Sequence, residues 1–137
     1  MKVLTSKKGV TIIELLVTIV IIAILALIAA VIYNSQVRSS RRTDAINTLF
    51  AIALAEESYR TSNTTYGTLG QVWNGTTSTG GYYNIAVSTV AATTYTITAT
   101  ATGDQVNDSQ NGTSCSTLTY SMNAGTVTES PTACWPS

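Results

Sequence analysis

The first third of the chain is dominated by one apolar run. Residues 10–32 read VTIIELLVTIVIIAILALIAAVI, and Glu14 is the only charged residue among these 23 positions. A helix of this length, rising 1.5 Å per residue, is roughly 34 Å long, which is enough to cross the hydrocarbon core of a bilayer. The run is too long for the core of a secretory signal peptide, and no small-residue cleavage site with a turn follows it. The pattern therefore predicts a retained membrane-spanning helix.

Helical periodicity continues beyond the apolar run. Residues 34–59 contain neither Gly nor Pro, and their apolar positions recur with the spacing of one helix face: Ile46, Leu49, Phe50, Ala53 and Leu54. The arginines and acidic residues of this stretch fall largely on other faces. We therefore expect one helix from about Val10 to Arg60, whose second half packs the apolar stripe against a sheet.

The second half of the chain alternates with the period of two that is typical of strands. Residues 82–87 and 95–101 alternate in this way, and residues 118–122 and 126–128 form a second hairpin around a turn at 123–125. The turn contains Gly125, which suits a position with positive φ. These elements predict the α+β class: a long N-terminal α-helix, membrane-spanning in its first half, packed on a four-stranded antiparallel sheet.

Two loops connect these elements. Residues 61–81 are rich in Gly, Thr and Ser, but Tyr66, Leu69, Val72 and Trp73 are too apolar for a free linker, and we expect them to fold this loop onto the sheet domain. Residues 103–114 are polar. Their oxygen-bearing side chains could suggest a calcium site, but the spacing lacks the EF-hand order and its distal Glu, so a plain loop is favoured and an ion site is the alternative: Asp104, Asn107, Asp108 and Asn111.

Composition argues against an enzyme. Charged residues make up 10% of the chain, and it contains no His and two Cys. The commonest base at neutral pH is therefore absent, and the inventory is too small for a zinc site. We expect no catalytic residues, no metal site and no cofactor.

The charges are placed unevenly. Lys2, Lys7 and Lys8 precede the apolar run, which predicts a cytoplasmic amino terminus and a head outside the cytoplasm. Four arginines follow the run, and no Lys or Arg follows Arg60. A head of this composition offers little to a phosphate backbone, so the charge distribution argues against a nucleic-acid partner.

Two features suggest specific chemistry. Cys115 and Cys134 are the only cysteines, and in an oxidising compartment we expect them to form a structural disulfide that encloses the last hairpin, worth roughly 3 kcal/mol in the chain-entropy model. Glu14 is a carboxylate inside the apolar run, which costs about 2.5–3.5 kcal/mol on insertion scales. It either reaches water at the cytoplasmic interface or pairs with a positive charge, such as a free amino terminus at Val10 supplied by its own chain or a neighbour.

The start of the apolar run resembles a known leader. The sequence KKGVTIIELL at residues 7–16, followed by an unbroken apolar run, is similar to the prepilin leader of type IV pilins. The resemblance implies that a prepilin peptidase cuts between Gly9 and Val10 and methylates Val10. It also implies that Glu14 is used in docking subunits into a filament, where a core of sister helices would partner the long helix.

The chain departs from the usual pilin pattern at three positions. Val10 stands where the family usually has Phe, Ala23 where it often has Gly, and Val31 where it often has a helix-breaking Pro. Proline removes a backbone hydrogen bond and kinks a helix. We therefore expect residues 10–32 to be straighter than the usual pilin helix.

The C-terminal part carries a second, less specific resemblance. The run YTITATA at 95–101, the spacing from Cys115 to Leu118, and Gly125 ahead of Cys134 are similar to minor pilins of the PilE kind and to ComP-like DNA-uptake receptors. Such receptors present a basic stripe on the head, which this chain lacks. A pilus-tip or pilus-surface binding module, either a DNA-uptake receptor or an adhesin, and a type II secretion pseudopilin remain as alternatives to a structural pilin.

The resemblance implies three segments: a leader peptide at 1–9, a transmembrane and filament-core helix at 10–33, and a head at 34–137. The implied partners are other pilin subunits, the prepilin peptidase and the type IV pilus assembly machinery. The implied location is the bacterial inner membrane, crossed once with the head outside the cytoplasm, before assembly, and an extracellular pilus afterwards.

Overall fold

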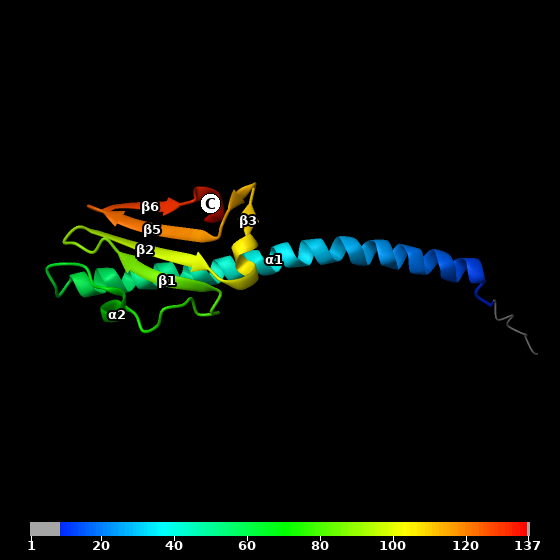
Figure 1. Ribbon diagram of the computed structural model, residues 1–137, viewed down its shortest axis with the longest axis horizontal. Coiled ribbons are helices and arrows are strands. Elements are labelled where there is room, and N and C mark those ends of the chain that lie inside the picture. Colours follow the sequence, from blue (N-terminus) through cyan, green and yellow to red (C-terminus); the bar gives the residue numbers. More distant parts are fainter. Residues whose placement is uncertain (1–8, 137) are drawn as a thin grey trace, which may run out of the picture. The chain divides into compact units, whose positions relative to one another are not determined.

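The computed structural model describes residues 9–136, without the side chains of residues 30 and 31. Lys2, Lys7 and Lys8 therefore lie outside the described residues. The chain forms two compact units, Met1–Gln36 and Val37–Ser137. One helix, α1 (Ile12–Arg60), contributes to both, as predicted from the periodicity (Figure 1).

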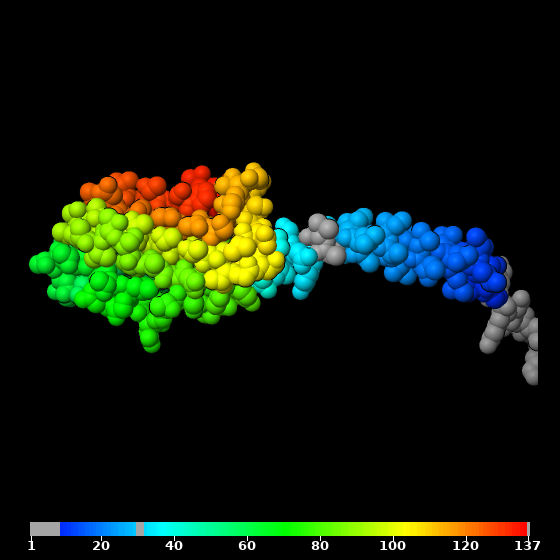
Figure 2. All heavy atoms as spheres, viewed as in Figure 1, coloured from blue at the N-terminus to red at the C-terminus, as the bar shows by residue number. Residues whose placement is uncertain are grey.

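Between residues 9 and 36, the first unit is an apolar helical segment in which every described side chain is exposed. Among the large apolar residues described there, the exposed fraction runs from 50% for Leu16 to 80% for Ile12. The most apolar window of α1 has a mean hydropathy of 3.4, and none of it is buried. By length and composition the helix can cross a membrane. On the face shown in Figure 2, the blue atoms of this segment are uncovered.

The second unit packs the end of α1 against an antiparallel sheet (Figure 1). The sheet has the strand order β1-β2-β5-β6, as follows: β1 (Tyr83–Ser88), β2 (Thr94–Ala101), β5 (Thr117–Asn123) and β6 (Thr126–Ser130). All three pairings are antiparallel. The four-stranded sheet predicted from the alternation is confirmed. Each strand edge lies within two residues of its expected position.

The core lies between α1 and one face of the sheet. Leu49 and Ile52 from α1 meet Tyr83, Tyr95 and Ile97 from the strands, and all five are fully buried. The prediction of which α1 residues face the core is wrong in part. Ile46, Leu49 and Ala53 are buried as predicted, but Phe50 is 40% exposed and Leu54 is 73% exposed. The buried arc is rotated toward Ala45, Ile52 and Glu56, because the sheet covers that side of the helix.

The opposite face of the sheet carries no charged side chain on its four strands. The residues on this face alternate along each strand with the core residues. On neighbouring strands they lie opposite one another, so that Thr98 of β2, for example, is paired with Ala86 of β1 and with Thr119 of β5. Nearly all are small and polar: Asn84, Ala86, Ser88, Thr94, Thr96, Thr98, Thr100, Thr117, Thr119, Ser121, Asn123, Thr126, Thr128 and Ser130. Threonine suits a strand whose hydroxyl faces water.

The connection between α1 and β1, residues 61–82, packs on the head as expected. It contains a short helix, α2 (Leu69–Val72), capped by Thr68 in a capping box with Gln71. The apolar residues predicted to hold it down are all partly buried against the core: Tyr66, Leu69, Val72 and Trp73.

The polar loop after β2 is more ordered than a plain loop. It forms a 3₁₀ turn, η1 (Gly103–Asn107), and a two-stranded ribbon, β3 (Ser109–Gln110) with β4 (Thr113–Ser114). A second 3₁₀ turn, η2 (Thr132–Cys134), follows β6, and the disulfide between Cys115 and Cys134 ties it to the segment that joins β4 to β5. The expected disulfide loop is therefore present, with 5.7 Å between the two Cα atoms.

Candidate functional site

The expected cleavage site lies just ahead of the helix. Gly9 and Val10 precede the first turn of α1, and both are exposed. Thr11 caps this turn, because its Oγ1 accepts a hydrogen bond of 3.3 Å from the N–H of Glu14. The cap starts the helix immediately after Val10. The two residues on either side of the expected cut therefore lie outside the helix and are exposed.

Glu14 lies in the first turn of α1 and is exposed. Among the residues that the structure describes, its carboxylate forms no ion pair and no hydrogen bond. It is surrounded along the helix by exposed apolar side chains, including Ile12, Leu15 and Val17. A negative charge near a helix N-terminus is favourable, but in an apolar environment it needs a cation. The described part of this subunit does not supply one.

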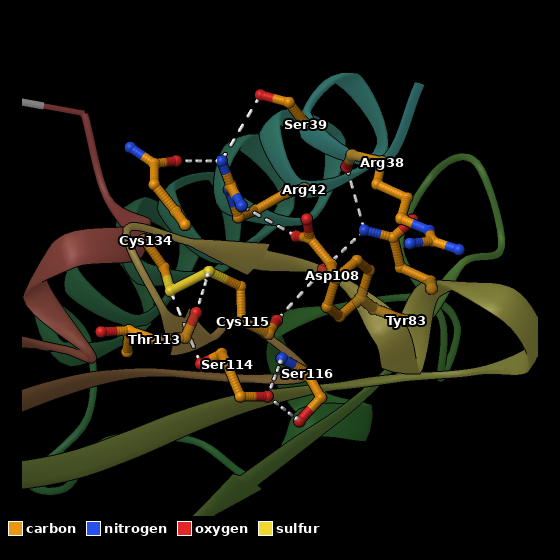
Figure 3. The surroundings of a disulfide bond; sticks show 12 residues. Arg38, Ser39, Arg42, Tyr83, Asp108, Thr113, Ser114, Cys115, Ser116 and Cys134 are labelled. Carbon is orange, nitrogen blue, oxygen red and sulfur yellow. Dashed lines mark hydrogen bonds and ion pairs between the residues drawn. A yellow bond between two sulfur atoms is a disulfide. The ribbon is translucent and has the colours of Figure 1, made fainter. Parts of the chain in front are cut away.

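In the head, Arg42 and Asp108 form a buried ion pair. The Nη1 of Arg42 lies 2.9 Å from Oδ2 of Asp108, and the two side chains are 7% and 4% exposed. Arg42 also donates to Gln110 Oε1 and Ser39 Oγ. The pair links α1 to the residue that joins η1 to β3 (Figure 3). Because both charges are buried, each depends on the other for compensation.

A second, exposed pair repeats this arrangement one helical turn earlier. Arg38 donates from Nη2 and Nε to the carboxylate of Asp104, at 3.0 and 3.2 Å. The hydrogen bond from Arg38 holds the pKa of Asp104 below its ordinary value. Both pairs join residues 66 positions apart. Two arginines four residues apart on α1 thus match two aspartates four residues apart, one within η1 and one directly after it.

The remaining two arginines of residues 9–136 are also engaged within the head. The guanidinium of Arg41 lies 4.3 Å from the centre of the Tyr82 ring. Arg60 donates to the carbonyl oxygens of Ala92 and Asn63, at 3.0 and 2.6 Å. All four arginines therefore have internal partners, and the head presents no cluster of free cationic groups to an anion.

The disulfide lies beside the buried ion pair (Figure 3). Tyr83 connects the disulfide to η1, since its hydroxyl accepts a hydrogen bond of 3.0 Å from Gln105 Nε2 and donates one of 3.3 Å to the carbonyl of Cys115. Burial raises the pKa of Tyr83. Gln105 also donates to the carbonyl of Arg38 at 2.9 Å. Gln105 thus ties η1 to α1 by a hydrogen bond, and the disulfide joins Cys134 to Cys115.

A half-open groove of about 230 Å³ lies between α1 and the C-terminal end of the chain. Its lining includes Phe50 and Trp135, with their ring centres 5.8 Å apart, and the polar side chains of Arg42 and Gln110. Among the described residues no group of three His, Cys, Asp or Glu side chains could hold a metal ion. Asp104 and Asp108, which sequence reasoning offered as ion ligands, face arginines instead.

The structure brings together some predicted residues and not others. It joins Cys115 to Cys134, and it places Gly9, Val10 and Glu14 along one short stretch. The burial of Arg42 and Glu56 contradicts the expectation that charged residues of α1 occupy other faces. The sequence did contain a signal for the pairing of Arg42, because the four-residue spacing between Arg38 and Arg42 recurs between Asp104 and Asp108.

Comparisons with known proteins give two family matches. The family model described as "Type IV minor pilin ComP, DNA uptake sequence receptor" matches residues 32–119. The model described as "Prokaryotic N-terminal methylation motif" matches residues 4–30. None of the curated proteins matches the chain. The two models adjoin and together cover the apolar helix and most of the head.

Proposed function

The chain belongs to the type IV minor pilin family of the ComP kind, and we propose that it is processed at its amino terminus and assembled into a pilus through its apolar helix. It is a minor pilin subunit, and its long helix, four-stranded sheet and disulfide fit the pilin fold. Pilin families are structural, and assembly with other pilin subunits and the pilus machinery follows from membership. We propose no catalytic role and no cofactor for this chain.

One observation carries the assembly proposal. None of the most apolar window of α1 is buried within the chain, although this window has a mean hydropathy of 3.4. Leaving so many large apolar side chains in water would be costly, at about 25 cal/mol per Å². The helix therefore needs an apolar environment before and after assembly: a bilayer in the first state, and the helices of neighbouring subunits in the second.

For processing, we propose that a prepilin peptidase cuts between Gly9 and Val10 and that Val10 is then N-methylated. The methylation-motif match at residues 4–30 supports this position, as do the exposure of both residues and the helix that begins directly after them. The corresponding segments are a leader at 1–9, a membrane and filament-core helix at 10–33, and a head at 34–137.

For assembly, we propose that Glu14 pairs with the amino terminus of Val10 of a neighbouring subunit. Four residues of helix rise about 6 Å, so the amino terminus of the same chain is a competing partner. In support, the carboxylate has no partner among the described residues. Before assembly the chain would sit in the inner membrane, crossing it once, with the head outside the cytoplasm.

The experiment is intact-mass analysis of the protein recovered from sheared surface filaments and, separately, from membranes. We expect a filament species that begins at Val10, is lighter by the two hydrogens lost in the disulfide, and is heavier by one methyl group. Recovery of only the uncut chain, and only from membranes, would overturn the assembly proposal. A mature species without the methyl group would overturn only the methylation.

DNA-uptake reception is a second candidate, because the match at residues 32–119 is to a family described as a DNA uptake sequence receptor. The head's electrostatics argue against strong phosphate binding. All four arginines of residues 9–136 have internal partners, and the strands carry no charge on their outward face. Fluorescence anisotropy with labelled duplex DNA over a range of salt concentrations tests this candidate. Affinity that falls steeply with salt, with a slope of about −0.9 per phosphate contacted, would establish DNA binding.

A further inference from the structure

Glu56 is a fully buried carboxyl group that the proposed function does not use. It lies near the end of α1, on the helix side that faces the connection 61–82, and it is 0% exposed. Its Oε2 accepts a hydrogen bond of 2.7 Å from the backbone N–H of Gly67. Its Oε1 is buried and has no hydrogen-bond partner among the described atoms. Buried acidic groups are rare unless paired, so this one calls for an explanation.

The groups around Glu56 offer no positive charge to pair with it. Glu57 and Arg60 lie on the same helix, Tyr66 comes from the connection, and Tyr95 comes from β2. Arg60 is bound to carbonyl oxygens, and Glu57 accepts a hydrogen bond of 3.0 Å from the Tyr66 hydroxyl. The two ion pairs found in the described part of the chain involve other residues.

This environment favours the neutral form of the carboxyl. Burial raises the pKa of Glu56, the hydrogen bond from Gly67 lowers it, and the charge of Glu57 raises it further. A proton on Oε1 would remove the uncompensated charge and leave Oε2 free to accept from Gly67. The Tyr95 hydroxyl is likewise buried with no hydrogen-bond partner among the described atoms, and this burial raises the pKa of Tyr95.

The hydrogen bond between Glu56 and Gly67 holds the first part of the connection against α1. Tyr66, its neighbour, packs against Tyr95 with the ring centres 4.6 Å apart. Gln71 of α2 donates to the Tyr59 hydroxyl at 3.0 Å. Gly67 itself fits so closely that a Cβ atom there would lie 2.6 Å from Val72 Cγ1. A change at Glu56 is therefore transmitted directly to the segment that covers the core at this end of the head.

We propose that Glu56 is a proton-operated latch, which holds the connection 61–82 on the head when it is protonated and loosens it when it is ionised. A carboxyl whose pKa is raised by folding keeps its proton longer in the folded state. The protonated Glu56 therefore stabilises the fold fully when the pH is below 4.5, the ordinary pKa of the group. This stabilisation is lost as the pH rises through the higher pKa that Glu56 has in the folded chain. The connection is thus held more firmly in acidified surroundings than at neutral or alkaline pH.

Hydrogen exchange tests the latch on the full chain in detergent micelles. Deuterium uptake of peptides covering residues 61–73 is measured between about pH 4.5 and about pH 8 and corrected for the intrinsic pH dependence of exchange. In the wild-type chain we expect the protection of these peptides to be lower at the higher pH. The decrease should be about tenfold for each unit by which folding raises the pKa of Glu56. Glu56→Gln keeps the shape and removes the charge, so its protection should not change with pH.

Glu57→Gln is the matched control, because Glu57 is the adjacent acidic residue and is exposed. It should retain most of the pH dependence of the wild type. Equal protection of the wild-type chain at all pH values, or the same pH dependence in Glu56→Gln as in the wild type, would overturn the proposal. If Glu56→Gln does not fold, carboxyl carbon-13 shifts of the wild-type chain decide. The carboxyl signal assigned to Glu56 must then titrate above 4.5, and a Glu56 midpoint at or below 4.5 would refute the latch.

Discussion

Replacing Arg42 by Met tests how much the buried ion pair contributes to the head. The substitution removes the guanidinium that lies 2.9 Å from Asp108 and also bonds Ser39 and Gln110. Methionine preserves much of the side-chain length, so the packing change is small. What remains is an aspartate whose side chain is 4% exposed and has lost its counter-charge.

The magnitude follows from this burial. Breaking a buried pair by removing one partner costs about 3–5 kcal/mol, because the remaining charge is neither solvated nor compensated. For a head of about 100 residues each kcal/mol lowers the melting temperature by about 4–8 °C, so we expect a fall of more than about 10 °C. The exposed pair supplies the contrast. Asp104 is 63% exposed, so solvent screens its pair with Arg38, and Arg38→Met should lower the melting temperature much less than Arg42→Met.

The assay is thermal and urea unfolding of the full chain in detergent, followed by the signals of its tryptophans. Trp135 packs near this site, and its ring centre is 6.4 Å from that of Tyr120. The double variant Arg42→Met, Asp108→Leu removes both charges and should recover much of the lost stability. If Arg42→Met and Arg38→Met lower the melting temperature equally, or if the double variant is no better than Arg42→Met, the uncompensated-charge argument is wrong.

Three other outcomes follow from the structure. Glu14→Ala should be cleaved normally but enter filaments poorly, which quantitative immunoblots of sheared filaments and membranes will measure; wild-type recovery from filaments would exclude the charge pairing. Cys115→Ser should lower the stability of the head by about 2–4 kcal/mol in urea unfolding without changing leader cleavage, and an unchanged midpoint would show that the disulfide contributes little. Gly67→Ala should cost about 1–3 kcal/mol, because its Cβ would lie 2.6 Å from Val72 Cγ1. Gly70→Ala is the control, since nothing lies within 4 Å of a Cβ there, and equal costs would mean that crowding is not the cause.

The elements of this fold could be predicted from the sequence, because their patterns are local. The apolar run and the following periodicity gave one helix, and the structure has α1 from Ile12 to Arg60. The strands were predicted from the alternation of apolar and polar residues. In β2 this alternation is seen in the burial, because Tyr95, Ile97 and Ala99 are buried and the threonines between them are partly exposed. The leader motif marked Gly9, Val10 and Glu14 because it is short and contiguous, and their roles remain predictions.

The tertiary polar contacts could not be predicted in the same way. Arg42 and Glu56 look like surface residues of a helix, since periodicity assigns a face only from apolar positions. Their burial depends on which side of α1 the sheet and the connection 61–82 cover. The exposure of Phe50 and Leu54 has the same origin. An ordered ribbon inside the polar loop was also missed, because β3 and β4 have two residues each and leave no periodic signal.

The hydroxyl-covered face of the sheet affects how the head meets other surfaces. A protein surface normally carries both signs of charge, which attract or repel a partner across a distance of about 8–10 Å at physiological ionic strength. The outward face of these four strands carries neither sign. No field from this face steers or deflects an approaching molecule. An encounter there is decided when hydroxyl groups and the partner's own polar groups touch, and the face itself adds nothing to the dependence of the encounter rate on ionic strength.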